Sequence, residues 1–144
     1  MLVHDRRAPL ISATGSCNMG RKIGGAVSKR LGRSLLELGG NNGIIVMPDS
    51  DPELVLRAVV FGAVGTTGQR CTSTRRLFLH KDISKDITQR LVDAYSQVKI
   101  GDPLDSDTIM GPLVDNGAVK DYEDALKIIK KEKGEVLYLS LKHI

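Results

Sequence analysis

Two side chains of this sequence could together form and then hydrolyse a thioester. Cys71 follows directly on segment 65–70 (GTTGQR), whose small residues would leave a thiol accessible to a small substrate. Glu37 lies earlier in the chain, as a lone carboxylate between Leu36 and Leu38. A cysteine thiolate can attack a carbonyl carbon, and a carboxylate can activate the water that hydrolyses the product. The pair therefore indicates covalent catalysis on a carbonyl substrate.

Attack by Cys71 requires the thiolate, and a free cysteine has a pKa of about 8.5. Arg70 and Arg75 are close in the sequence and supply positive charge that could lower this pKa. The backbone N–H of Cys71 could also donate to an oxyanion formed on the attacked carbon. The alternative is a buried cysteine in a loop, and chemistry alone does not separate the two interpretations. We expect the other cysteine, Cys17, to be a small packing residue.

Glu37 is expected to act as a general base. Burial of its ionised carboxylate between two leucines would be costly, so we expect burial to raise its pKa. A carboxylate with a raised pKa is suited to accept a proton near neutral pH. The alternative is a structural glutamate paired with an arginine, for instance Arg33.

A second glycine-containing turn, residues 15–20 (GSCNMG), lies where a strand is expected to end and a helix to begin. Free N–H groups and the helix dipole at such a position favour a phosphate group. The turn lacks the Gly-x-Gly-x-x-Gly pattern of dinucleotide-binding proteins. Taken alone, it is better explained as an ordinary strand-to-helix turn.

Alternating strand and helix patterns must position these residues, and they predict an α/β fold with mostly parallel pairing. The expected strands are 8–12, 35–38, 43–47 and 76–80, with a further strand beginning at 136. The expected helices are 21–31, 51–65, 84–98 and 115–133.

Several details of these elements can also be predicted. The strand at 43–47 is continuously apolar, so we expect it to be buried on both faces. The helix that begins at Asp51 is expected to bury five side chains, those of Leu54, Val55, Ala58, Val59 and Phe61. Expected N-caps are Asp51, Ser84 and Asp115. Gly32 is expected to end its helix as a left-handed C′ glycine, and Gly134 is expected to close the last helix.

The composition excludes several classes of function. The chain has 144 residues, one domain's worth, with 41% apolar and 26% charged residues, as in ordinary globular proteins. Aromatic residues make up only 3%, which disfavours nucleic-acid binding, and the basic stretch 127–133 is interpreted as a solvated helix face, with an anion-binding patch as the alternative. The two cysteines and three histidines show no metal-ligand spacing. We therefore expect no metal and no nucleic acid.

No membrane partner is expected either. No apolar run approaches the ~20 residues of a membrane span, and the N-terminus lacks the apolar region of a secretory signal. The few cysteines favour a reducing compartment. The expected location is the cytoplasm, with mitochondria as the alternative.

Several motifs together resemble the aldehyde dehydrogenase superfamily, and in particular its antiquitin-like branch, the α-aminoadipic semialdehyde (Δ1-piperideine-6-carboxylate) dehydrogenases. The motifs are SATGS at 12–16, LLELGGNN at 35–42, VGTTGQRCT at 64–72, RRLF at 75–78, GDPL at 101–104 and GPL at 111–113. The double asparagine and the arginine before Cys71 are the more particular marks of that branch. The resemblance extends from about residue 9 to residue 135.

The resemblance implies a fragment of the aldehyde dehydrogenase fold. Residues 1–40 would form the C-terminal end of the Rossmann-like NAD(P)-binding domain, and 41–144 the first part of the parallel-sheet catalytic domain. Cys71 would attack an aldehyde, NAD or NADP would accept hydride, and Glu37 would activate water. The implied cofactor-binding residues are Gly15, Ser16, Gly20 and Leu38, and the implied substrate-binding residues are Arg70 and Thr72.

The resemblance also implies a small aldehyde as the partner and a homo-oligomeric full-length family. The sequence differs from the usual family pattern at Cys17, Asn18 and Gly43. Because family members are longer at both ends, we expect the 144-residue chain alone to be inactive and to be marginally stable or aggregated. Two alternatives are a CoA-acylating relative, against which Glu37 argues, and a truncated, non-catalytic paralogue that docks onto full-length subunits.

Overall fold

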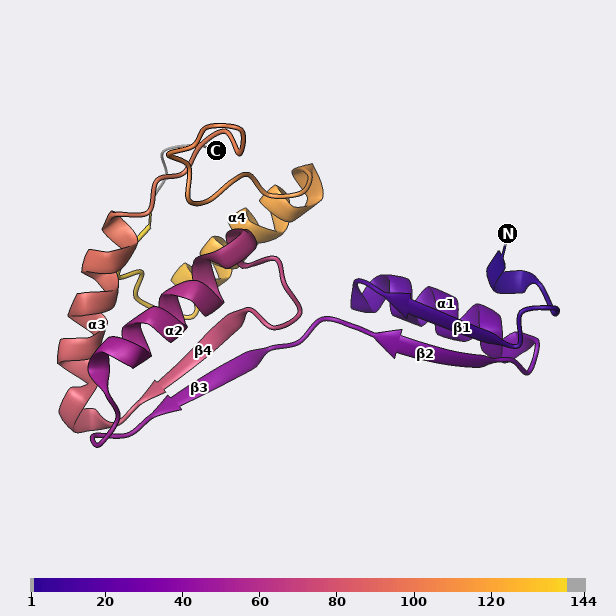
Figure 1. Cartoon of the computed structure of the whole chain (residues 1–144), viewed down its shortest axis with the longest axis horizontal. Helices are drawn as coiled ribbons and strands as arrows, with labels where there is room; N and C mark the ends of the chain where they lie inside the picture. The colour runs from indigo at the N-terminus through magenta and orange to yellow at the C-terminus, as the bar shows by residue number, and fades with distance from the viewer. Residues whose placement is uncertain (1, 140–144) are drawn as a thin grey trace. The chain divides into compact units, whose positions relative to one another are not determined.

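The computed structural model describes residues 2–139 and divides the chain into two compact units, Met1–Asn41 and Asn42–Ile144. Each unit contains a pair of parallel strands covered by helix (Figure 1). The predicted α/β class with parallel pairing is therefore confirmed. No helix within residues 2–139 is long and apolar enough to cross a membrane.

The first unit is a strand–helix–strand arrangement. Its elements are η1 (Leu2–His4), β1 (Leu10–Thr14), α1 (Cys17–Lys29) and β2 (Arg33–Glu37). Strands β1 and β2 pair in parallel, with Leu10 opposite Arg33 and Thr14 opposite Glu37. Helix α1 packs on this pair, and its Val27 is buried together with Ile11 of β1. The register places the end of β1 beside Glu37.

Helix α1 begins earlier than the predicted residue 21, because Ser16 is its N-cap and accepts a hydrogen bond at Oγ from the N–H of Met19. Its C-terminus also differs from the prediction. The left-handed residue is Leu31, with φ 60°, and not Gly32. The N–H groups of Leu31 and Gly32 donate to Ser28 and Val27, which is the Schellman pattern of helix termination.

The end of the last helix has the same arrangement, since Lys133 has φ 59° and precedes Gly134. In both places the glycine allows close approach instead of a positive φ. A Cβ at Gly32 would lie 3.0 Å from Val27 Cγ1, and one at Gly134 would lie 2.9 Å from Ile129 Cγ2.

The second unit contains β3 (Asn42–Val46), α2 (Pro52–Val64), η2 (Gly65–Gly68), β4 (Thr74–Leu79), α3 (Lys81–Ser96) and α4 (Asn116–Lys131). Strands β3 and β4 pair in parallel, with an irregularity between Asn42 and Gly43. Helices α2 and α3 pack against each other and against β4, and lie on one side of the sheet (Figure 1). The core contains Val46, Val59 and Ile87.

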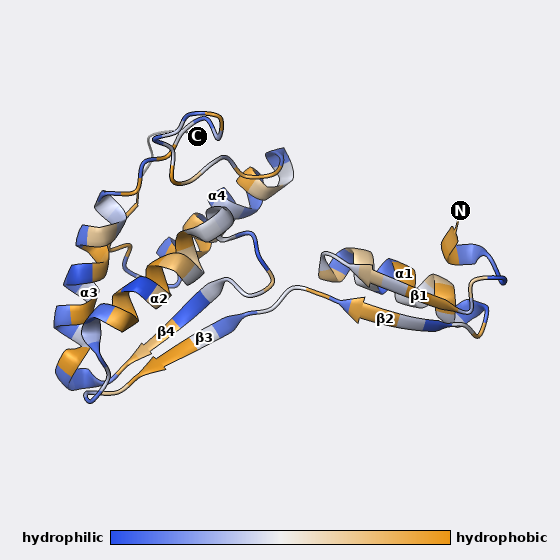
Figure 2. Ribbon diagram, viewed as in Figure 1, coloured by the Kyte–Doolittle hydropathy of each residue, from blue (hydrophilic) through white to orange (hydrophobic). Residues whose placement is uncertain are grey.

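Burial on both faces of β3 is not observed. Val46 is 1% exposed, whereas Ile45 is 76% exposed because the two helices cover only one face of this two-stranded sheet. Figure 2 shows hydrophobic residues along β3 and the second half of β4. In α2, Val59 is buried as predicted, but Leu54, Ala58 and Phe61 are exposed.

Two of the three predicted N-caps are confirmed, since Asp51 and Asp115 cap α2 and α4. The cap of α3 is His80, whose Nδ1 accepts from the N–H of Asp82, and not Ser84. Ser84 lies inside the helix, where its hydroxyl donates to the carbonyl of Lys81. Residues 135–139 form no strand, so the strand predicted to begin at 136 is wrong.

Candidate active site

Cys71 is a free cysteine and lies exposed in the turn between η2 and β4. The chain reaches it through three consecutive left-handed residues, Thr66, Thr67 and Gly68, with φ of 52°, 56° and 67°. This conformation is unfavourable for β-branched residues and is typically maintained by surrounding contacts. Because Cys71 is exposed, the buried-cysteine alternative is excluded for this structure. We call residues 66–73 the thiol turn, and its left-handed residues make it a strained segment.

The backbone of the thiol turn is held from β3. The side-chain Nδ2 of Asn42 donates to the carbonyl of Cys71 at 2.6 Å and to that of Ser73 at 3.1 Å. Ser73 is 1% exposed, and its Oγ accepts from the N–H of Arg70 at 3.0 Å. The main chain on both sides of Cys71 is thus fixed while the residue itself remains exposed.

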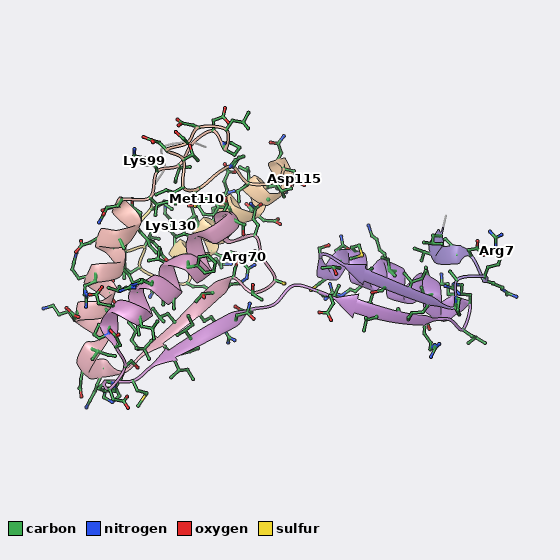
Figure 3. All side chains as sticks on the ribbon, viewed as in Figure 1. Arg7, Arg70, Lys99, Met110, Asp115 and Lys130 are labelled. Atoms are coloured by element: carbon green, nitrogen blue, oxygen red, sulfur yellow. The ribbon has the colours of Figure 1, made fainter. Side chains whose placement is uncertain are left out.

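Arg70 lies against the C-terminal end of α2 (Figure 3). Its Nη2 donates to the carbonyl of Phe61 at 2.8 Å, and its guanidinium lies over the Phe61 ring at 4.7 Å. Gly65 leaves room for it, because a Cβ there would lie 2.5 Å from Nη2. The guanidinium therefore connects the thiol turn to α2, while Thr72 beside Cys71 is exposed. Arg75 donates from Nη2 to the carbonyl of Gly68 at 3.4 Å.

In the first unit, the predicted cofactor residues gather at the N-terminus of α1. The N–H of Gly15 donates to the carbonyl of Glu37 at 3.0 Å, and Ser16 caps the helix. Gly20 is buried against Leu38, since a Cβ at Gly20 would lie 2.6 Å from both Leu38 Cδ atoms. The structure thus brings Gly15 to the backbone of Glu37 and Gly20 to the side chain of Leu38, the residue after Glu37.

The side chain of Glu37 is exposed, so the expected burial between two leucines is not observed. The physical reason is that β2 pairs only with β1, and Glu37 is its last residue. Among the described residues, 2–139, no ion pair joins Glu37 to Arg33. Cys17 is also exposed rather than packed, with its Sγ 4.0 Å from the carbonyl oxygen of Gly39.

Sequence reasoning missed several residues that hold the thiol turn, namely Asn42, Phe61, Thr67, Gln69 and Ser73. Asn42 belongs to the double-asparagine motif, so the signal was present without a role attached to it. The contact with Phe61 had no signal, because an aromatic residue on an apolar helix is expected in the core. Within residues 2–139 no group of three or more side chains suited to metal binding occurs.

The comparison with known families decides to which family this chain belongs. The model of the aldehyde dehydrogenase family matches residues 1–142. The chain belongs to the aldehyde dehydrogenase family. The resemblance seen in the motifs is thereby confirmed.

Individual relatives agree with this assignment. The chain is 50% identical over 136 residues to the aldehyde dehydrogenase family 7 member A1 homologue of Dictyostelium discoideum, which covers 94% of this chain and 27% of that protein. It is 47% identical over 137 residues to the α-aminoadipic semialdehyde dehydrogenase of Rattus norvegicus, covering 95% of this chain and 25% of that protein. The chain spans about a quarter of the length of these curated relatives.

The fold agrees with a solved structure. The betaine aldehyde dehydrogenase of Staphylococcus aureus, solved in complex with NAD⁺, matches with a TM-score of 0.87 and 28% identity over 90% of this chain and 26% of that one. The aldehyde dehydrogenase fold predicted from the motifs is confirmed, over a part of its full length.

Proposed function

We propose that this chain supplies the nucleophile and the general base for the NAD(P)-dependent oxidation of an aldehyde to a carboxylic acid. The observation that carries the proposal is the exposed Cys71 on a turn whose backbone is fixed by Asn42 and Ser73, in a chain of the aldehyde dehydrogenase family. In this proposal residues 1–40 belong to the cofactor-binding domain and residues 41–144 to the catalytic domain.

The covalent chemistry is assigned to Cys71. Its thiolate attacks the aldehyde carbon, a C–S bond forms, and the carbonyl oxygen becomes the oxyanion of a thiohemiacetal. The backbone N–H of Cys71 is proposed to donate to this oxyanion. Loss of the aldehyde hydrogen with its electron pair re-forms the carbonyl and leaves a thioester on Cys71.

Glu37 is assigned to the hydrolysis of the thioester. Its carboxylate accepts a proton from water, the oxygen of that water attacks the thioester carbon, and the C–S bond breaks. The products are the carboxylic acid and the thiolate of Cys71. An exposed carboxylate at the end of β2 is accessible to water, as this role requires.

A nicotinamide dinucleotide, when bound, supplies the hydride acceptor. The residues at the N-terminus of α1 would suit its phosphates, because helix N-termini favour anions and Gly15 and the N-cap Ser16 have small side chains there. Gly15, Ser16, Gly20 and Leu38 are therefore proposed to hold the cofactor. The solved relative described above contains NAD⁺, which supports a dinucleotide of the NAD or NADP type.

The proposed substrate is an amino-acid semialdehyde such as α-aminoadipic semialdehyde, as in the names of several relatives. Arg70 and Thr72 flank Cys71 and are proposed to contact it. For Arg70 this contact requires the guanidinium to leave the carbonyl of Phe61, which it contacts in the present structure.

The experiment uses the native polypeptide that carries this sequence, assayed for NADH formation with α-aminoadipic semialdehyde. We expect Cys71→Ala to abolish turnover. We expect Glu37→Gln to release about one equivalent of NADH in a burst and then to stall, because the thioester forms but is not hydrolysed. Turnover that survives Cys71→Ala would overturn the proposal.

The 144-residue chain by itself is proposed to lack dehydrogenase turnover, because it spans about a quarter of the length of its relatives. NADH formation by this isolated chain that is lost on Cys71→Ala would contradict that part of the proposal. It would leave the proposed roles of Cys71 and Glu37 intact.

A further inference from the structure

Gln69 lies two residues before Cys71, and its side chain extends away from the thiol turn to a distant segment of the chain. Its Oε1 accepts a hydrogen bond from the N–H of Val114 at 2.8 Å. Its Nε2 lies 3.4 Å from the carbonyl oxygen of Pro112 and 3.4 Å from that of Thr66, and donates to both. One amide thereby connects the thiol turn to segment 111–114.

Thr67 makes a second connection to the same segment. Its Oγ1 donates to the carbonyl of Gly111 at 2.9 Å. Thr67 and Gln69 thus both reach segment 111–114, one by its hydroxyl and one by its amide. Thr67 is also one of the left-handed residues of the thiol turn, with φ 56°.

Segment 111–114 is itself anchored at both ends. Before it, Met110 forms a parallel bridge with Ile100, and its N–H donates to the carbonyl of Lys99 at 3.0 Å. After it, Asp115 caps α4 by accepting from the N–H of Ala118 at 2.8 Å. Met110 and Asp115 are labelled in Figure 3. A segment held in this way can serve as a fixed support.

The thiol turn needs such a support, because consecutive left-handed threonines are unfavourable by themselves and persist only where surrounding contacts determine them. We infer that Gln69 and Thr67 are positioning residues, which hold the left-handed path of the thiol turn against segment 111–114 and so set the place of the Cys71 thiol. The inference rests on the proposed role of Cys71 as the nucleophile. Neither residue touches the substrate in this assignment.

Variants of Gln69 and Thr67 distinguish the effect of losing a hydrogen bond from the effect of losing side-chain volume. Gln69→Ala removes the whole amide. Thr67→Val replaces the hydroxyl by a methyl group of similar size, whereas Thr67→Ser keeps the hydroxyl that donates to Gly111. The matched control is Gln97→Ala, since Gln97 is another exposed glutamine whose Nε2 donates to a carbonyl, that of Asp93.

The measurement is steady-state turnover of the native polypeptide with α-aminoadipic semialdehyde and NAD⁺. We expect Gln69→Ala and Thr67→Val to lower kcat by about tenfold to a hundredfold, with the aldehyde KM changed by less than about threefold, because a thiol displaced by about 1 Å reacts more slowly without weaker binding. Thr67→Ser and Gln97→Ala should stay within about twofold of the parent kcat.

Cys71→Ala in the same series distinguishes failure of the positioning role from failure of the proposed function. If it abolishes turnover while Gln69→Ala and Thr67→Val keep the parent kcat, the positioning role is wrong and the proposed function stands. If Cys71→Ala retains turnover, the proposed function fails, and the positioning role fails with it. Should Gln69→Ala lose its folded circular dichroism spectrum, Thr67→Val against Thr67→Ser decides, and equal kcat values for that pair would overturn the inference.

Discussion

At the scale of single residues, the proposed chemistry depends on backbone groups that side chains hold in place. Asn42 donates to two carbonyls of the thiol turn, and Ser73 accepts from the N–H of Arg70. A buried or partly buried carbonyl that loses its donor costs about 1–3 kcal/mol. The exposed thiol of Cys71 is therefore supported by residues that have no reactive role themselves.

Asn42→Asp tests this support, because it keeps the shape and replaces the donating Nδ2 by an oxygen. The new oxygen would face the carbonyls of Cys71 and Ser73 instead of donating to them. We expect the free energy of unfolding to fall by about 1–3 kcal/mol, measured by urea denaturation. Asn116→Asp is the control: it lies in the first turn of α4, where a carboxylate is favourable, and should change stability by less than about 0.5 kcal/mol.

Tyr95 of α3 provides a pH-dependent prediction. Burial raises the pKa of Tyr95 above its usual value of about 10, because the phenolate would be desolvated. The folded state therefore retains this proton at a pH where the unfolded state loses it. The contribution to stability is fully present below about pH 10 and is lost as the pH rises through the folded-state pKa.

Urea denaturation between pH 9 and pH 11 checks this prediction. The parent protein should lose more stability over that range than Tyr95→Phe, which has no proton to lose at this position. Equal losses in the two proteins would show that the burial of Tyr95 has no effect on its titration.

At the scale of elements, helix ends and glycines follow local rules that sequence patterns capture only in part. The N-caps Asp51 and Asp115 are recognisable because each side chain accepts from an N–H two or three residues on. At the C-terminus of α1 the pattern predicted glycine in the left-handed position, and the structure has Leu31 there, as it has Lys133 after α4. The glycine instead follows one residue later, where it contacts the helix closely.

Leu31→Gly tests the assignment of the left-handed position. Leu31 is 95% exposed, so its removal loses little packing, and a left-handed conformation costs a leucine roughly 1–2 kcal/mol more than a glycine. We expect the free energy of unfolding to rise by about 0.5–1 kcal/mol, measured from the urea midpoint. Lys29→Gly, in the right-handed last turn of α1, should lower it. A loss of stability in Leu31→Gly would contradict the assignment.

At the scale of the whole molecule, the chain has more apolar surface than its own helices cover. In the second unit, Ile45 and Phe78 are register partners on β3 and β4, and they are 76% and 52% exposed. Gly43 lies beside them, since a Cβ there would lie 3.2 Å from Phe78 Cε2. Exposed apolar faces and unpaired strand edges promote association.

Ile45→Thr should therefore reduce self-association of the isolated 144-residue chain, measured by static light scattering at increasing concentration. Threonine keeps the strand preference, and the side chain is exposed, so the urea midpoint should change little. The matched control is the neighbouring Val46→Thr, which buries a hydroxyl in the core and should lower the urea midpoint. Unchanged scattering in Ile45→Thr would show that this face does not drive association.

The sequence by itself determined the family, the α/β class, the parallel pairing and two helix caps. These features depend on short motifs and on the alternation of strand and helix patterns, which are local. It also indicated Cys71 as an accessible thiol, because glycine and threonine precede it. It also predicted that the turn at 15–20 lies between a strand and a helix, which the structure confirms.

Only the tertiary structure decided what surrounds these residues. Glu37 is exposed because β2 has a single neighbouring strand, and Arg70 contacts Phe61 because the thiol turn folds back on α2. The hydrogen bond between Gln69 and Val114 joins positions 45 residues apart in the chain. Contacts of that range depend on how the helices and strands pack, so no local pattern in the sequence could have predicted them.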